Sequence, residues 1–197
     1  IKEIKPLKVI GLTATPVILE PSLDLGSSLL MLNRTNKSAF ESIIHVTQIK
    51  DIIKNGYWTD IIYHNEKFND KYLVRSSSGN DFTEESIVRS FELNNTSEKI
   101  VENYENMVSK GLKHILIFVP SVDKAYELSW FIKGSEVITG ETNKKDRSEI
   151  LKRFLSGITR CVINFGILGT GFDFPELDGV INGRATNSFA VYYQFLG

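Results

Sequence analysis

The feature that most constrains the fold is the alternation of short apolar runs with helical patterns in the second half of the chain. The apolar runs cover residues 114–119, 136–139, 160–165 and 180–182. Most segments between them show the period of amphipathic helices about 10–15 residues long. Because this alternation is typical of parallel βαβ units, we predict a three-layer α/β domain with a parallel sheet from about Asn95 onward.

Polar residues mark the expected starts of the helices. Asn95 with Glu98 fits a capping box, for a helix that ends near residues 110–111. Ser121 and Asn143 fit the N-caps of the next two helices, and a last helix is expected from Ser188. One further helix is expected before these, over residues 83–91.

The first 75 residues show weaker patterns than the rest of the chain. Short strands are expected at residues 8–12, 42–46 and 58–63, with a helix over 48–54 and irregular chain over 20–37. The stretch "SSSGND" at residues 76–81 has the composition of a linker. We therefore expect residues 1–75 to be the tail of a first α/β domain, residues 76–94 a linker, and residues 95–197 a second domain.

Composition excludes several classes of protein. The single cysteine, Cys161, lies in an apolar run, which excludes a disulfide framework and indicates a core side chain in a reducing compartment. His45, His64 and His114 lack metal-ligand spacing, so no metal site is expected. No apolar run approaches the roughly 18 residues of a membrane span, so no membrane partner is expected. The net charge of −1 argues against binding nucleic acid through overall charge, and any such contact must be local.

Four polar stretches directly follow apolar runs. They are "TATP" (13–16), "PS" (120–121), "TGET" (139–142) and "GTGFD" (169–173). In open α/β sheets, ligands bind at the carboxyl ends of the strands, and glycine lets backbone N–H groups approach a phosphate. One glycine pair alone is a weak signal that a tight turn explains. Four such stretches together indicate a ligand site at this edge of the sheet.

The same stretches resemble the motifs of one enzyme superfamily. "GLTATP" resembles motif III of superfamily-2 helicases and translocases of the DEAD/DEAH type, and "ILIFVPSVDKAYEL" resembles motif IV. "INFGILGTGFDFPELDGVI" resembles motif V, and "GRATNSFAVYYQFLG" resembles the run into motif VI. Within the superfamily, the branch of RadD-like and XPB-like DNA repair helicases is the most similar. The resemblance from residue 116 to residue 197 implies a nearly complete second RecA-like domain.

The resemblance also implies roles for individual residues. Those implied to bind ATP, or to couple its state to domain closure, are Thr13, Thr15, Gly169, Gly171, Asp173 and Gln194. Those implied to contact the phosphates of a nucleic-acid strand are Ser121, Thr139, Gly140 and Thr170. Hydroxyls and backbone N–H groups suit phosphate oxygens without reading sequence, and the Asp173 carboxylate suits the ribose hydroxyls.

The chain departs from the family pattern in three places. It has no glycine-rich loop with a lysine, no Asp-Glu pair before "TATP", and none of the arginines that follow the position of Gly197 in the family. We therefore expect no catalytic residue within the chain, with ATP and Mg²⁺ held mainly by other residues of the parent helicase. Because the chain also begins at Ile1 rather than methionine, we expect it to be a fragment. The implied partners are DNA, or alternatively RNA, and the missing N-terminal RecA-like domain, in the cytoplasm or another reducing compartment that contains nucleic acid.

Several residues have interpretations that require no ligand. The basic cluster of Lys144, Lys145, Arg147, Lys152, Arg153 and Arg160 fits a nucleic-acid footprint or a solvated helix face, and Arg147 is expected to pack or cap locally. Trp130 and Phe131 are expected to pack, one of them under a helix.

The sequence thus favours the motor-domain portion of an ATP-dependent helicase or translocase, which is inactive by itself. A second hypothesis is a RecA-like module that binds nucleic acid or a partner without turnover. An unrelated nucleotide-sugar enzyme ranks last, because it does not require "TATP" or a helical Gln194.

Overall fold

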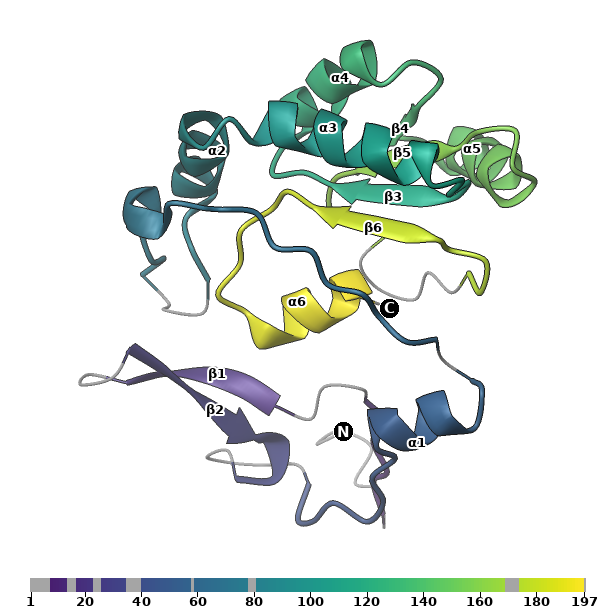
Figure 1. Ribbon diagram of the computed structural model, residues 1–197. Coiled ribbons are helices and arrows are strands. Elements are labelled where there is room, and N and C mark those ends of the chain that lie inside the picture. Colours follow the sequence, from purple (N-terminus) through teal and green to yellow (C-terminus); the bar gives the residue numbers. More distant parts are fainter. Residues whose placement is uncertain are drawn as a thin grey trace. The chain divides into compact units, whose positions relative to one another are not determined.

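The computed structural model describes residues 8–13, 17–22, 26–34, 40–57, 59–77, 81–168 and 174–196. The chain divides into two compact units, Ile1–Lys67 (unit 1) and Phe68–Gly197 (unit 2). Unit 1 contains an antiparallel ribbon of β1 (Val17–Ser22) and β2 (Gly26–Met31), the short helix η1 (Leu32–Arg34) and helix α1 (Ile49–Lys54) (Figure 1). The ribbon lies where irregular chain was expected, so that prediction was wrong.

The three strands expected in unit 1 do not form in the described residues. Residues 8–13, 42–48 and 59–63 have no regular structure, and Trp58 lies outside the described residues. Their apolar side chains are exposed: Ile10 by 74%, Leu12 by 96% and Ile62 by 81%. A strand is stabilised by pairing with neighbouring strands, and no described segment pairs with these residues. The helix expected over 48–54 is confirmed as α1.

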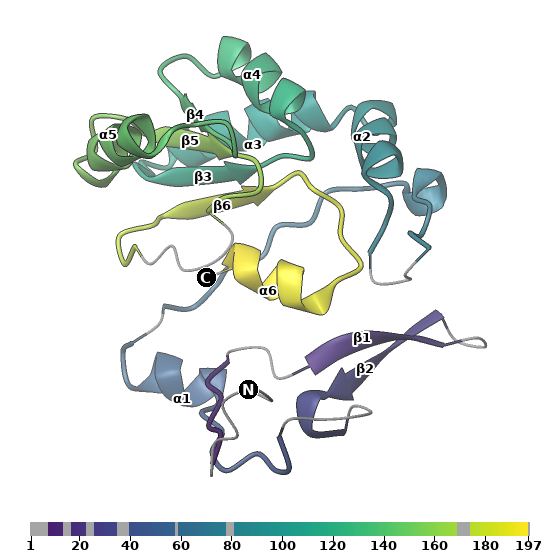
Figure 2. The ribbon, with the colours of Figure 1, turned by 180° about the vertical axis from the view of Figure 1, so that it is seen from behind.

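Unit 2 is built on a four-stranded parallel sheet with the strand order β4-β5-β3-β6. Its strands are β3 (Ile115–Phe118), β4 (Glu136–Ile138), β5 (Cys161–Asn164) and β6 (Gly179–Asn182). Its helices are η2 (Asp70–Tyr72), α2 (Glu84–Leu93), α3 (Thr96–Ser109), α4 (Val122–Phe131), α5 (Lys144–Leu155) and α6 (Phe189–Leu196). Figure 1 and Figure 2 show α3 and α4 on one side of the sheet and α6 on the other.

Alternating side chains of the strands supply two hydrophobic cores, one on each face of the sheet. On the first face, Ile115 and Ile117 of β3 pack with residues of α2, α3 and α4 such as Phe91 and Leu128. On the second face, Leu116 and Phe118 pack with residues of α5 and α6, namely Ile150, Phe154 and Phe195. This period-2 alternation between two covered faces confirms the predicted three-layer α/β fold. Cys161 lies in the first core, and burial raises the pKa of its thiol.

The helix starts confirm most of the predicted caps. The Ser121 and Asn143 side chains accept hydrogen bonds from the N–H groups of Lys124 and Asp146, as predicted. Thr83, which was not predicted to be a cap, accepts the N–H of Ser86 in the same way. Asn95 does precede α3, but its side chain makes no cap hydrogen bond. Its backbone has a φ of 51°, a left-handed conformation that asparagine tolerates better than most residues. Asn95 therefore provides a turn between α2 and α3 rather than the predicted capping box.

The boundary between the parts differs from the expected one. The predicted linker, residues 76–94, contains α2, and Ile87 and Phe91 of this helix are only 1% and 2% exposed. The division of the chain lies between Lys67 and Phe68 rather than after residue 75. A helix that buries two large side chains belongs to the domain that buries them, so α2 is part of unit 2.

The exposure of the aromatic residues near the end of α4 also differs from the prediction. Trp130 is 74% exposed and Phe131 64% exposed, although both were expected to pack. The buried face of α4 consists of Ala125 and Leu128, followed by Ile132 after the helix. Because that face already covers the sheet, Trp130 and Phe131 lie on the exposed side of the helix.

Candidate functional site

The last residues of the four strands in unit 2 form one row. Phe118 of β3 is in register with Asn164 of β5 and with Asn182 of β6, and Asn164 is in register with Ile138 of β4. Because all four strands are parallel, the loops that follow them leave the sheet at the same edge. This carboxyl edge is where an open α/β sheet presents its ligand site.

Ser121 lies at this edge, just after β3, as predicted. It is half-buried, and its hydroxyl oxygen accepts the N–H of Lys124 at 3.2 Å, which caps α4. The hydroxyl hydrogen of a capping serine remains available as a donor. Lys124, in the same helical turn, forms ion pairs with Glu92 at 3.0 Å and Glu127 at 2.7 Å. Burial alone would lower the pKa of Lys124, but hydrogen bonds to Glu127 and Glu92 raise it, so the ammonium is held charged and paired.

Thr139 and Gly140 form the turn after β4. Thr139 is fully buried, its hydroxyl oxygen accepts the N–H of Glu141 at 3.2 Å, and its own N–H donates to the Thr142 hydroxyl at 2.9 Å. Thr139 therefore shapes the turn, and this geometry does not support the direct phosphate contact expected of it. Gly140 is exposed, and a Cβ added there would meet no atom within 4 Å. Of the two, Gly140 is the residue that can face a ligand.

Asn164, the last residue of β5, was not singled out from the sequence. It is 1% exposed, and its side-chain oxygen accepts the N–H groups of Ile167 at 3.3 Å and Leu168 at 3.0 Å. Its side-chain nitrogen is buried without a hydrogen-bond partner. Asn164 thus fixes the start of the glycine-rich loop that resembles motif V. An asparagine that ends an apolar strand two residues before the first glycine of the loop was the signal that could have identified it.

The loop after β6 leads to α6, on which Gln194 was predicted to act. Asn182 ends β6, and its side-chain oxygen accepts the N–H of Arg184 at 3.0 Å. Near the other end of α6, Phe195 is 8% exposed and its ring lies 4.4 Å from that of Phe118, measured between centroids. The backbone of Gln194 belongs to α6. The orientation of its side chain lies outside the described structure.

Several predicted site residues cannot be placed. Thr15 and all of Gly169, Thr170, Gly171 and Asp173 lie outside the described residues. Thr13 is described and exposed, but it belongs to unit 1. The structure therefore brings together Ser121, Thr139 and Gly140 of the predicted set, and it leaves the nucleotide-binding assignments as predictions.

The basic cluster separates into two parts along α5. Lys144 and Lys145 are exposed in the first turn, next in sequence to the turn at the carboxyl edge, and Arg147 is half-buried. Arg153, near the other end of α5, donates to Glu136 at the start of β4, with its Nε 2.8 Å from the carboxylate. The hydrogen bond from Arg153 lowers the pKa of Glu136, to which Thr159 also donates. Arg153 is therefore structural, whereas Lys144 and Lys145 remain solvated.

The described residues offer no site of their own for a metal ion. Over the described ranges, no three His, Cys, Asp or Glu side chains are grouped in a way that could hold one. Most of the residues that the resemblance assigns to ATP lie outside the described residues. Within the same ranges, no helix has the length and apolar character needed to cross a membrane.

Comparison with known proteins identifies relatives of the chain. The family described as "Helicase conserved C-terminal domain" matches residues 95–197. IRC3 of Saccharomyces cerevisiae, whose name describes an ATP-dependent helicase, is 26% identical over 162 residues, covering 70% of this chain and 23% of IRC3. The ATP-dependent RNA helicase ROK1 of Lodderomyces elongisporus is 32% identical over 87 residues, covering 42% of this chain and 16% of ROK1. The chain thus spans less than a quarter of the length of either relative.

Two solved structures are similar in part. The helicase domain of Pyrococcus furiosus Hef matches with a TM-score of 0.43 and 17% identity, covering 57% of this chain and 27% of that one. S. cerevisiae Dbp5 bound to RNA matches with a TM-score of 0.45 and 20% identity, covering 51% and 27%. The family match spans more than half of the chain and confirms the resemblance drawn from the motifs. With its three-layer parallel sheet, the chain therefore belongs to the superfamily-2 helicases, and it contains their conserved C-terminal domain, with a RecA-like fold.

Proposed function

We propose that unit 2 is the second RecA-like domain of an ATP-dependent nucleic-acid motor and that it grips one strand by its phosphates. The observation that carries this proposal is the single row of strand ends, which gathers Ser121, Gly140 and the loop after Asn164 at one edge. Hydroxyl and backbone N–H donors at such an edge suit phosphate oxygens and read no base. The names of the relatives, which describe ATP-dependent helicases, support the motor.

The charges near this edge support a local electrostatic contact. Lys144 and Lys145 are exposed and begin the helix that follows the Gly140 turn. Lys124 is already paired with two glutamates and adds little net positive charge. The strand would therefore be held by a few donors and by two lysines, which agrees with a chain whose net charge is −1.

ATP would be bound between this domain and a first RecA-like domain. Gly169, Gly171, Asp173 and Gln194 would supply the contacts from this chain, with Thr13 and Thr15 coupling the nucleotide state to closure. Hydrolysis of ATP to ADP and phosphate would supply the free energy for movement, whereas Mg²⁺ would be held by residues other than those described. The role of this chain would be to bind the strand and to orient α6.

Substitution of Ser121 by aspartate gives a sharp test of strand binding. Aspartate caps a helix as well as serine does, so α4 should be retained. The new carboxylate would repel phosphates, and we expect the affinity for a labelled single strand to fall at least about tenfold, which corresponds to about 1.4 kcal/mol. Fluorescence anisotropy at fixed salt measures the affinity, and urea denaturation measures the stability.

Two variants control this experiment. Ser121→Thr keeps both the cap and the hydroxyl and should bind nearly as the parent does, because threonine caps only slightly less well. Lys144→Glu with Lys145→Glu should weaken binding and make the log–log salt slope shallower by about 1.4, at roughly 0.7 for each phosphate of a single strand. Unchanged binding in both Ser121→Asp and the double variant would refute a strand site at this edge.

The same binding measurement also tests whether the domain distinguishes DNA from RNA. The motifs favoured DNA, whereas ROK1 is named as an RNA helicase. Contacts to phosphates alone do not distinguish the two, because that distinction requires the 2′-hydroxyl. We therefore expect single-stranded DNA and RNA of equal length to bind within a few-fold of each other. If nucleotide does not change strand binding in a protein with a complete ATP site, that result would favour the alternative, a RecA-like module that binds nucleic acid without hydrolysing ATP.

A further inference from the structure

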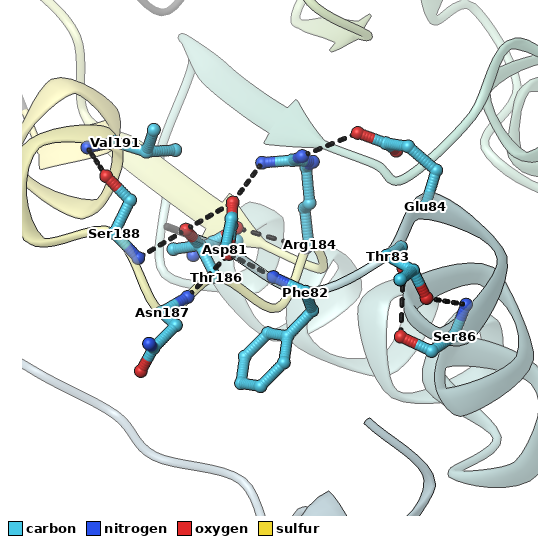
Figure 3. Close-up of polar contacts among 11 residues, drawn as sticks. Asp81, Phe82, Thr83, Glu84, Ser86, Arg184, Thr186, Asn187, Ser188 and Val191 are labelled. Atoms are coloured by element: carbon cyan, nitrogen blue, oxygen red, sulfur yellow. Dashed lines mark hydrogen bonds and ion pairs between the residues drawn. The ribbon is translucent and has the colours of Figure 1, made fainter. Parts of the chain in front are cut away.

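A cluster of polar side chains in unit 2 lies outside the strand ends described above. It joins residues 81–84, at the start of α2, to residues 182–188, which connect β6 to α6 (Figure 3). The central residue is Asp81, which is separated from its partner Thr186 by 105 positions in the sequence. The cluster therefore links the first part of unit 2 to its last helix.

The Asp81 carboxylate receives several hydrogen bonds from the loop before α6. One oxygen accepts the Thr186 hydroxyl at 3.0 Å, and the other accepts the N–H of Asn187 at 2.7 Å. The guanidinium of Arg184 lies 3.7 Å from the carboxylate, and its second nitrogen contacts Glu84 of α2 at 3.0 Å. The side chains of Asp81 and Arg184 are only 23% and 17% exposed, so these contacts are largely shielded from water.

The hydrogen bonds continue into the first turn of α6. The oxygen of Thr186 that donates to Asp81 also accepts the N–H of Ser188 at 3.0 Å. The hydroxyl oxygen of Ser188 accepts the N–H of Val191 at 3.4 Å, inside the helix. The Thr186 hydroxyl thus donates to Asp81 and accepts from Ser188. Through this hydroxyl, the position of Asp81 sets the start of α6.

Asp81 is itself held in place by its own segment. Its backbone oxygen accepts the N–H of Ser76 at 2.8 Å, and its carboxylate accepts the N–H of Phe82 at 2.9 Å. The next residue, Phe82, forms an antiparallel bridge with Arg75. The carboxylate is therefore an anchored acceptor rather than a surface charge that happens to lie nearby.

We propose that Asp81 is a positioning residue for the ATP site: through Thr186 and Ser188 it fixes the start of α6, the helix that carries Gln194. The other end of the helix is anchored by Phe195 against Phe118. This inference rests on the proposed function, in which α6 faces the nucleotide. The same hydrogen bonds connect Asp81, just before α2, to the start of α6.

Hydrogen exchange in the 197-residue chain tests the link without any activity. In Asp81→Ala, the amides of Asn187, Ser188 and Val191 should exchange about tenfold faster, the scale of one lost hydrogen bond. The amides of β3 and β5 should keep their protection. Glu85→Gln, an exposed acid four residues after Asp81 in the first turn of α2, is the matched control and should leave all of these exchange rates unchanged. Unchanged exchange at α6 in Asp81→Ala would overturn the proposal.

Turnover in a protein that joins this chain to a complete first RecA-like domain tests the consequence. Asp81→Ala and Thr186→Val should each lower kcat for strand-stimulated ATP hydrolysis about tenfold, with smaller changes in strand affinity and in KM for ATP. Thr186→Ser keeps the hydroxyl and should retain most of the activity. A merely structural role would leave kcat unchanged while exchange at α6 rises, and that result would refute the positioning role. If the joined protein without substitutions does not hydrolyse ATP, the proposed function is refuted instead. The hydrogen-exchange result would still decide whether Asp81 fixes the start of α6.

Discussion

Glu136 shows how one residue ties the start of a strand to a helix. It accepts hydrogen bonds from Arg153 of α5 and from Thr159, and its side chain is 22% exposed. The pKa of Glu136 is lower in the folded state than in the unfolded state. Its contribution to stability is therefore present when the pH is above the pKa of the unfolded state, and it is lost as the pH falls through the pKa of the folded state. The ordinary value is 4.5, so the loss should begin near that pH and grow below it.

Replacement of Glu136 by glutamine should make the stability of the chain less dependent on pH. We expect a loss of about 1 kcal/mol at pH 7, since Arg153 is 41% exposed and solvent screens the pair. The difference from the parent should shrink as the pH falls below 4.5. Urea denaturation at several pH values measures this, with Glu105→Gln on the exposed face of α3 as the control. A difference that stays constant down to pH 3 would contradict the assignment.

Trp130 gives a second prediction, because it was expected to pack and its side chain is 74% exposed. In a Trp58→Phe background, which leaves Trp130 as the single tryptophan, iodide should quench the fluorescence nearly as well as it quenches free tryptophan. Trp130→Ala should change the free energy of unfolding by at most about 0.5 kcal/mol. Phe154→Ala, a fully buried control, should cost about 3–5 kcal/mol. Weak quenching or a large loss for Trp130→Ala would show that the residue packs.

At the scale of elements, most signals within one helical turn were predicted correctly, although the capping box at Asn95 was not. Of the distant pairings, the parallel sheet was predicted from the alternation of strands and helices, and the others were not. Ser121 and Asn143 were correctly placed as caps, because a cap depends on residues within one helical turn. The strands expected in unit 1 failed because a strand needs partners that the local pattern does not specify. The link from Asp81 to Thr186 could not be predicted for the same reason, since its ends lie 105 positions apart.

The positions of some candidate site residues were predicted from the sequence, whereas their roles stay predictions. The parallel sheet placed Ser121 and Gly140 at the expected edge, because the alternation of strands and helices determines where the loops emerge. Thr139 was assigned to a ligand, but its side chain is fully buried and its N–H donates to Thr142 within its own turn. Whether a hydroxyl faces solvent or its own backbone depends on turn geometry that the sequence pattern does not resolve.

The two asparagines that end β5 and β6 give a prediction about the loops. Asn164→Leu removes the acceptor for two N–H groups at a site that is 1% exposed, so we expect a loss of about 2–4 kcal/mol of stability. Asn182→Leu removes a similar acceptor at an exposed site, where water replaces it, and should cost less than about 1 kcal/mol. Urea denaturation of the two variants measures the difference. Equal losses would mean that Asn164 does not hold the start of its loop.

At the scale of the whole molecule, the hydrophobic cores of the described residues lie in unit 2. Both core clusters consist of residues between Phe91 and Phe195, and α1 and η1 of unit 1 contain no buried residue. Burial of apolar surface is the main favourable term in folding, at about 25 cal/mol for each Å². Unit 2 should therefore fold without unit 1.

This expectation can be tested with a chain shortened to residues 68–197. We expect its free energy of unfolding to lie within about 1 kcal/mol of that of the whole chain, because few buried contacts would be lost. The transition in urea should be cooperative, and circular dichroism and the fluorescence of Trp130 should give the same midpoint. Asp81, α2 and the whole parallel sheet remain in this shortened chain, so its Asp81→Ala variant should reproduce the faster exchange at the start of α6. A broad transition, or a loss of several kcal/mol, would show that unit 1 contributes to the core, and unit 2 would then not be an independent domain.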